Sequence, residues 1–288
     1  MFGLLNIDKP AGFSSRDVVN KVQRLARPAK VGHAGTLDPI ATGVLIVCVG
    51  PATRLETFIH RFPKTYEGEF LIGCTSPTDD TESEPEPLDG AAPLDEVMVR
   101  AALQRFTGRI EQVPPAFSAV KIAGRPAYKI ARKGTDVDIP PREVEIHALE
   151  LLELTSERMR LRVECGSGTY VRSLGRDLAA ALGSGAVMCG LRRSRIGPFT
   201  VEDAIDFAAI RSDSLADLLL PAQRALPGWP EVTLDDLELA LIRNGRQVET
   251  GERVASAEVA VLSQTGQLAA LAERNAAGTL QPRLVFRE

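Results

Sequence analysis

Residues 32–45, Gly-His-Ala-Gly-Thr-Leu-Asp-Pro-Ile-Ala-Thr-Gly-Val-Leu, place one carboxylate, Asp38, in a loop punctuated by glycine. Glycine permits positive φ angles and close backbone approach, while Pro39 stiffens the chain directly after the aspartate. The loop opens into the apolar run 44–49, which is typical of a buried strand. We therefore expect a carboxylate that a strand holds and presents to a ligand. Because aspartate beside proline and glycine also caps ordinary turns, other motifs must decide between the two interpretations.

Size and composition indicate a globular protein of two parts. The chain has 288 residues, of which 44% are hydrophobic and 25% charged. This length exceeds the usual single domain, so we expect one large core and a smaller module. No apolar run approaches the roughly 20 residues that span a bilayer, and residues 1–8 lack the basic segment and cleavage site of a secretory signal. The sequence therefore predicts a cytoplasmic protein that does not span a membrane.

Cysteine and histidine are scarce and scattered. Neither type shows the close spacing of a metal site or a redox pair, since they stand at Cys48, Cys74, Cys165, Cys189, His33, His60 and His147. We expect reduced thiols and no zinc or iron. The glycine loop also lacks the Gly-Lys-Ser/Thr ending of a phosphate-binding loop. The sequence therefore predicts chemistry without a cofactor or a metal.

Charge is unevenly distributed, although the net charge is only −4. Acidic residues gather in the proline-containing segment 78–96, which has no lysine or arginine and is expected to be a solvated loop. Such groups of charge are often only solvated faces, but three basic groups together favour a polyanionic partner. These groups are Lys21, Arg24, Arg27 and Lys30, then Arg125, Lys129, Arg132 and Lys133, and finally Arg192, Arg193 and Arg195.

Hydrophobic periodicity predicts alternating strands and helices. A first helix begins after Ser14 or Ser15, and further helices are expected at 53–62, 94–106, 126–133, 173–182 and 234–243. Strands are expected at 4–7, 44–49, 65–72, 117–122, 144–154, 158–165, 258–262, 267–272 and 283–286, with another strand-like run ending at 195. Prolines at 221, 227 and 230 predict a linker. We therefore expect two domains, residues 1–228 and a compact β-rich module at 231–288.

Five motifs, in order along the chain, resemble the TruB-type tRNA pseudouridine synthases. They are KPAGFSS at 9–15, GHAGTLDPIATGVL at 32–45, KTY at 64–66, VPPAFSAVKIAGRPAY at 113–128 and GTYVRSLGRDL at 168–178. The tail from about residue 231 resembles the PUA-type RNA-binding module of this family. The resemblance implies an α+β fold with a mixed, largely antiparallel sheet flanked by helices, followed by a small β-rich PUA-like domain.

The resemblance also implies an isomerase that converts uridine 55 in the T-loop of tRNA to pseudouridine, without cofactor, metal or guide RNA. Such an enzyme would act as a monomer on the T-arm, flip the target base out of its stack and additionally assist tRNA folding. Asp38 would be essential, either as the nucleophile at C1′ or as the base that takes the 2′ proton to give a glycal. Both routes need the ionised carboxylate, and the sequence leaves both open.

The same resemblance assigns roles to other residues. Arg172 would pair with Asp38, lower its pKa and fix its orientation. Tyr66 would stack on the target base and help to remove the C5 proton. His33 would occupy the space that the flipped nucleotide leaves. The remaining residues that would line the pocket or bind the RNA are Tyr170, Leu191, Lys9, Lys64, Arg132, Lys133 and Arg192.

Three other functions stay open. A guide-RNA-dependent pseudouridylase of the dyskerin kind shares the aspartate loop, but it usually has more chain before the Lys-Pro motif, which begins here at Lys9. A noncatalytic RNA-binding or tRNA-folding protein would not need Asp38, Tyr66 and Arg172 to be intact. Without the resemblance, a hydrolase with an aspartate nucleophile is the remaining interpretation, although no second convergent carboxylate or metal ligand accompanies Asp38.

Overall fold

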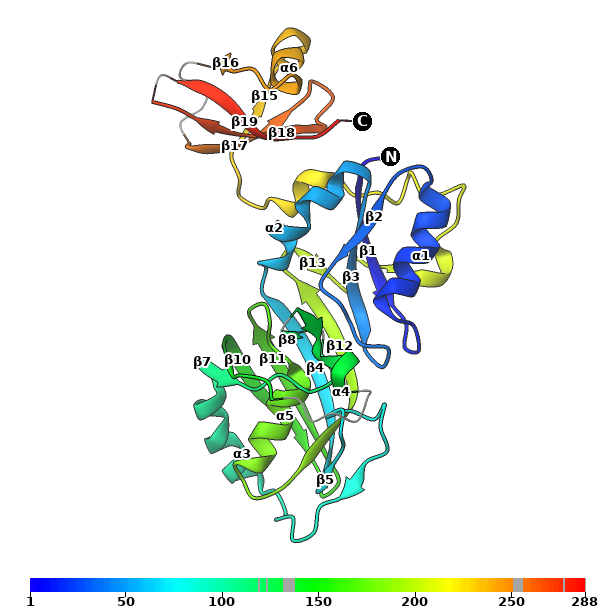
Figure 1. The fold of residues 1–288 in the computed structure, drawn as a ribbon, viewed down its shortest axis with the longest axis vertical. Coiled ribbons are helices and arrows are strands. Elements are labelled where there is room, and N and C mark those ends of the chain that lie inside the picture. Colours follow the sequence, from blue (N-terminus) through cyan, green and yellow to red (C-terminus); the bar gives the residue numbers. More distant parts are fainter. Residues whose placement is uncertain (119, 123, 132–137, 251–255, 277, 288) are drawn as a thin grey trace.

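The computed structural model describes residues 1–118, 120–122, 124–131, 138–250, 256–276 and 278–287, and contains two main sheets (Figure 1). The larger sheet has the spatial order β14 (Ile205–Asp206), β1 (Gly3–Lys9), β3 (Thr42–Val49), β12 (Ala186–Ile196), β4 (Lys64–Ile72), β11 (Arg158–Cys165), β10 (Arg142–Leu154) and β7 (Gly108–Gln112). Strand β2 (Val31–Ala34) pairs with β3, and β13 (Phe199–Thr200) pairs with β12. Among the described pairs of this sheet, only β1 with β14 and β12 with β3 are parallel. The predicted mixed, largely antiparallel sheet is confirmed.

Helices and short hairpins connect these strands. The helical segments are α1 (Ser15–Ala26), η1 (Gly50–Leu55), α2 (Glu56–His60), α3 (Glu96–Leu103), η2 (Gln104–Phe106), α4 (Ala127–Ala131), α5 (Val171–Ala180), η3 (Phe207–Ala209) and η4 (Ala222–Ala225). Two small hairpins pair β5 (Cys74–Thr75) with β6 (Glu86–Pro87) and β8 (Lys121–Ile122) with β9 (Arg125–Pro126). Within the described residues, no helix is long and apolar enough to cross a membrane.

Helix α1 shows how the sequence fixes the strands that flank the glycine loop. The Ser14 hydroxyl accepts the N–H of Asp17, and the Asp17 carboxylate accepts the N–H of Ser14, which forms a capping box. Valines at helical spacing on α1 pack against one face of β1 and β3. The opposite face of these strands lies in a second cluster with residues of η1 and α2. Both faces of β3 are therefore buried, and the loop before it is anchored.

Three predicted elements differ in the structure. The expected helix 53–62 is split into η1 and α2, because Pro51 lies in the first turn of a 3-10 segment that precedes the α-helix. The expected strand 117–122 is reduced to the two residues of β8. The expected helix 126–133 begins only at Ala127, because Pro126 belongs to β9. Gly124, with φ +81°, provides the turn of this hairpin.

The smaller sheet contains β15 (Glu231–Thr233), β17 (Glu258–Leu262), β18 (Leu268–Arg274), β19 (Thr279–Val285) and β16 (Val248–Glu249) in that order, with α6 (Asp236–Arg243) beside it. It sits at one end of the molecule, where both chain ends meet (Figure 1). Phe2 and Phe286 stack there at a centroid distance of 5.4 Å, and Trp229, in the predicted linker, meets Phe58 edge-on at 5.6 Å. One apolar cluster includes residues of both sheets, so the smaller sheet is packed on the larger part.

Gly43 is a point where the fold depends on a missing side chain. Its φ is +100°, and a Cβ atom there would lie 2.2 Å from the backbone oxygen of Arg193 on β12. We expect Gly43→Ala to lower the free energy of unfolding by about 3 kcal/mol or more, measured by denaturant unfolding. Gly90→Ala is the matched control, because Gly90 also has a positive φ but open space around it, so about 1–2 kcal/mol is expected. Equal losses would contradict the steric explanation.

Candidate active site

A cavity of about 560 Å³ lies where the loop after β2 meets β4, β12 and the start of α5. Segments that are far apart in the sequence thus converge on one space. Six of the predicted site residues line it, namely Asp38, Lys64, Tyr66, Tyr170, Arg172 and Leu191. A cavity of this size can hold a nucleotide.

The loop that carries Asp38 is held by hydrogen bonds to its backbone. The Ser15 hydroxyl, at the start of α1, accepts the N–H of Leu37 at 2.8 Å and donates to its carbonyl at 3.0 Å. The Lys9 amine is buried beneath the loop and donates to the carbonyls of Phe13, at 2.6 Å, and Pro39, at 3.5 Å. The position of the carboxylate is therefore determined by groups on both sides of Asp38.

Arg193 holds the same loop from β12. Its side chain is 1% exposed, and its Nη2 and Nε donate to the carbonyls of Gly35, at 2.8 Å, and Val44, at 2.7 Å. A third bond, from Nη1 to the Thr36 carbonyl, spans 3.5 Å. A buried guanidinium needs such acceptors, because an unpaired buried charge is costly. Arg193 thereby ties the two ends of the glycine loop together.

Arg172 connects Asp38 to a second carboxylate. Its Nε lies 3.3 Å from Oδ2 of Asp38, and its Nη1 lies 2.9 Å from Oδ2 of Asp80. The same guanidinium donates to the carbonyls of Thr78, at 2.9 Å, and Phe117, at 3.3 Å. The side chains of Arg172 and Asp80 are 6% and 1% exposed, whereas that of Asp38 is 36% exposed at the cavity. The Asp38 carboxylate is therefore the accessible end of a buried charged network.

The acidic segment 78–96 is not simply a solvated loop, and the prediction is wrong at two of its positions. Besides the buried Asp80, Asp79 is 14% exposed and pairs with Arg176 at 2.6 Å. Arg172 and Arg176 are four residues apart on α5 and therefore share one face of that helix. The beginning of the acidic segment supplies the carboxylates that these two arginines require.

Comparison with known proteins identifies the family. The N-terminal domain of TruB family pseudouridylate synthases matches residues 23–171, and the C-terminal domain of tRNA pseudouridylate synthase B matches residues 172–227. The tRNA pseudouridine synthase B of Xanthomonas campestris pv. campestris is 40% identical over 291 residues, 99% of this chain and 94% of the relative. The chain belongs to the TruB family of pseudouridylate synthases. It is thus a pseudouridine synthase, an isomerase.

A second curated relative and two solved structures also match almost the whole chain. The tRNA pseudouridine synthase B of Xylella fastidiosa is 42% identical over 289 residues, 99% of this chain and 95% of that protein. A solved H/ACA RNP bound to a substrate RNA containing 2′-deoxyuridine contains a chain with a TM-score of 0.72 and 24% identity, covering 100% of this chain and 86% of that one. A Cbf5-Nop10-Gar1 complex contains a chain with a TM-score of 0.70 and 25% identity. The match covers 99% of this chain and 85% of that one. The smaller sheet is therefore part of the shared fold.

The pKa of Asp38 in this TruB-family site is raised above the ordinary 3.8. Burial of the carboxyl is the largest cause, the nearby Asp80 carboxylate acts in the same direction, and the Arg172 guanidinium opposes both. Arg172 does lower the pKa of Asp38, as the sequence predicts, but lost hydration outweighs this effect and the net shift is upward. The ionised Asp38 is consequently a stronger base than a solvated aspartate.

Tyr66 lies on β4 opposite Arg193 of β12, whose guanidinium carbon is 5.9 Å from the ring centre. The ring packs against the apolar cluster that contains Phe70 and also lines the cavity. Burial raises the pKa of the Tyr66 hydroxyl. A neutral aromatic ring fixed on a strand can stack on a planar base.

Lys64 lines the cavity and also fastens its wall. Its amine donates to the Ser167 hydroxyl at 2.7 Å and to the carbonyl of His60. Burial lowers the pKa of Lys64 to about 8. These contacts join the turn before α5 to the end of α2.

Three predicted site residues lie outside the cavity lining. Lys9 is fully buried, which lowers its pKa to about 8, and its amine binds backbone carbonyls. His33 lies on β2, where burial lowers its pKa. Arg192 pairs with Asp8 at 2.9 Å beside a smaller cavity. Arg132 and Lys133 lie outside the described residues. Contact of RNA with these two residues, and with the three named above, stays a prediction.

Sequence reasoning missed Asp80, Arg193 and Ser15 as parts of the site. Arg193 follows the cavity residue Leu191 by two positions on β12. Residues two apart on a strand face the same side, so this spacing could have indicated Arg193 from the sequence. Ser15 was visible only as a helix cap. Asp80 carried no local signal, because its neighbours are equally acidic and polar.

Proposed function

We propose that this pseudouridine synthase converts uridine 55 in the T-loop of tRNA to pseudouridine, without a guide RNA, with Asp38 as the essential group. The observation that carries the proposal is the accessible Asp38 carboxylate, paired with Arg172 in a cavity that Tyr66 also lines. The names of relatives matched over 94–95% of their length support tRNA as the substrate.

The reaction rearranges bonds within one nucleotide. The bond from N1 to C1′ breaks, the base rotates while held, C5 bonds to C1′, and the C5 proton leaves while N1 gains one. Ionised Asp38 either attacks C1′ or removes the 2′ proton to give a glycal, and both routes remain open. The target base must leave its stack to reach a carboxylate inside a cavity, so the proposal includes base flipping.

Arg172 and Tyr66 have distinct roles in this proposal. Arg172 orients the carboxylate and favours its charged form against the effect of burial. Tyr66 stacks on the rotating base and helps to remove the C5 proton, while Tyr170 and Leu191 line the pocket. These assignments follow the shared cavity lining.

The domain organisation and setting form a further part of the proposal. Residues 1–228 form the catalytic domain, and residues 231–288 form a PUA-like RNA-binding domain. The enzyme acts as a monomer in the cytoplasm, where its tRNA substrate is processed, and it assists tRNA folding.

The test is tritium release from C5-labelled uridine in an unmodified tRNA transcript, with purified protein, no metal and no guide RNA. We expect tritium release from position 55 when the transcript carries uridine there. No release from that position is expected when cytidine replaces it. Release that requires an added guide RNA would favour the guide-dependent class. Tight tRNA binding without release would favour a noncatalytic RNA-binding protein.

The pH dependence of the chemical step gives a separate prediction. Because Asp38 must be ionised and its pKa is raised, the rate is expected to increase with pH along an acid limb whose midpoint lies above 3.8. Single-turnover rates at saturating enzyme between about pH 4 and pH 8 measure this limb. Circular dichroism over the same range verifies that the protein stays folded. A rate that shows no decrease toward about pH 4 would contradict a raised pKa of an essential Asp38 carboxyl.

A further inference from the structure

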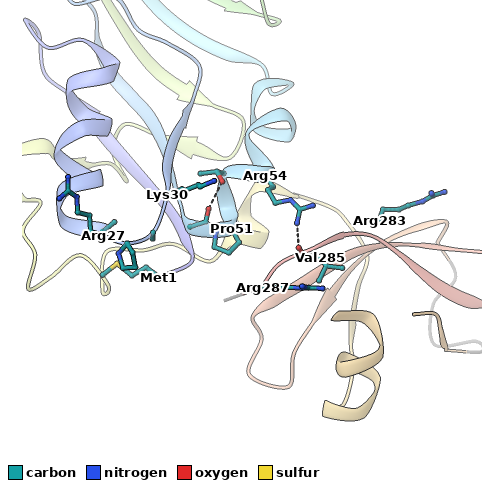
Figure 2. Close-up of a pocket in the computed structure, with 13 residues that line it drawn as sticks. Met1, Arg27, Lys30, Pro51, Arg54, Arg283, Val285 and Arg287 are labelled. Carbon is teal, nitrogen blue, oxygen red and sulfur yellow. Dashed lines mark hydrogen bonds between the residues drawn. The ribbon is translucent and has the colours of Figure 1, made fainter. Parts of the chain in front are cut away.

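A second, larger cavity lies between the two sheets (Figure 2). It is at the opposite end of β2 from the Asp38 loop. Its volume is about 990 Å³. One wall comes from the α1–β2 turn and η1, and the other from β19 and the residues after it. Among the described residues, its lining contains five cationic side chains and no carboxylate; the cations are Arg27, Lys30, Arg54, Arg283 and Arg287. We call this cavity the basic cleft.

The charges of the basic cleft are poorly compensated. Arg283 pairs with Glu273, whereas within the described residues Arg54 and Arg287 donate to backbone carbonyls only. The side chains of Arg27 and Lys30 have no hydrogen-bond or ion-pair partner within the described part of the chain. Gathering like charges without counter-charges is unfavourable unless an anion binds between them.

The arginines of strand β11 behave differently from those of the basic cleft. On the exposed side of β11, every arginine faces a glutamate, with Arg158 bound to Glu69 and both Arg160 and Arg162 bound to Glu67. On this strand the fold supplies a counter-charge for each arginine. Among the described residues, the basic cleft has such a counter-charge only for Arg283.

The two walls of the basic cleft are fixed relative to each other. The stacked pair Phe2–Phe286 and the contact of Arg54 with the Val285 carbonyl join them directly. Apolar residues of both sheets pack in one cluster beside them. The cleft is consequently formed before any ligand arrives, which reduces the entropy lost on binding.

We propose that the basic cleft binds the phosphodiester backbone of the RNA substrate, outside the arm that contains the target uridine. The identity of the ligand as tRNA rests on the proposed function above. Lys30 directly precedes β2 and Gly35 directly follows it, so the cleft and the glycine loop are separated by about 17 Å of strand. That is about half of one turn of a nucleic-acid duplex, so one folded RNA can reach both sites.

The test compares two RNAs, a full-length unmodified tRNA transcript and an isolated T-arm hairpin. The double variant Arg27→Gln/Lys30→Gln removes two cleft charges. Arg100→Gln/Arg105→Gln is the matched control, because it removes two charges on α3 and η2, outside the cleft lining. Dissociation constants are measured over a salt series, and thermal melting verifies folding. The single variant Arg287→Gln probes the opposite wall.

We expect the cleft double variant to weaken binding of full-length tRNA about tenfold and to reduce its salt slope by about 2, with hairpin affinity changed less than about twofold. The control double variant should weaken binding of both RNAs only slightly and to the same extent. An unchanged salt slope, or equal weakening of tRNA and hairpin by the cleft variant, would overturn the proposal. Failure of the proposed function is seen separately, as absence of tritium release by the wild type.

Discussion

Replacing Asp38 with asparagine is expected to slow pseudouridine formation by about 10⁴-fold or more, with tRNA affinity changed less than about threefold. Asparagine keeps the shape of the side chain but can neither attack C1′ nor accept the 2′ proton. Single-turnover tritium release measures the rate. Asp177→Asn is the matched control, because Asp177 is 34% exposed and paired with an arginine, much like Asp38, but lies outside the cavity lining. Its rate should stay within about twofold of wild type.

The stability of the Asp38 variant distinguishes lost chemistry from lost folding. The folded-state pKa of Asp38 is raised, so the folded protein binds this proton more tightly than the unfolded chain. Wild-type stability from this group is therefore present below the unfolded pKa and is lost as pH rises through the folded pKa. Asp38→Asn has no titrating carboxyl at this position and does not lose this stability. Its free energy of unfolding relative to wild type should therefore increase with pH between the unfolded-state and the folded-state pKa of Asp38. Denaturant unfolding at several pH values measures the difference, and the opposite trend would contradict the raised pKa.

The Asp38 loop could be predicted from sequence because its determinants are local. The glycines, Pro39 and the buried strand that follows all lie within residues 32–49. Strands β4, β10 and β11 were also visible, because each shows a long pattern that matches its period. Strand β8 lies within the expected strand 117–122, but β9 was missed, because a hairpin this short is set by the turn at Gly124 rather than by periodicity.

The supports of the site could not be predicted in the same way, because they depend on contacts between distant segments. Asp80 precedes its partner Arg172 by 92 residues, and composition assigns its segment to solvent. Lys9 lies in a motif where a lysine suggests phosphate binding, yet its amine is buried against carbonyls of the glycine loop and its own turn. Whether a cation meets solvent, RNA or backbone is decided by tertiary packing.

Replacing Arg172 with glutamine is expected to damage both stability and catalysis. Asp80, 1% exposed, would remain buried without its guanidinium, which should lower the free energy of unfolding by about 3–5 kcal/mol. Asp38 would also lose its orienting partner, so the single-turnover rate should fall by about 10²–10³-fold. Arg160→Gln is the matched control, because Arg160 pairs with two glutamates but is 45% exposed, so at most about 1 kcal/mol is expected.

The double variant Asp80→Asn/Arg172→Gln separates these two effects. Removing the carboxylate of Asp80 together with the guanidinium removes the fully buried charge that would otherwise lack its partner, so stability should recover by about 2 kcal/mol or more relative to Arg172→Gln. The rate should stay low, because Asp38 still lacks its partner. Denaturant unfolding and single-turnover tritium release measure the two quantities on the same samples. If activity returned together with stability, Arg172 would act only by supporting the fold, and the orienting role that its 3.3 Å contact with Asp38 implies would be wrong.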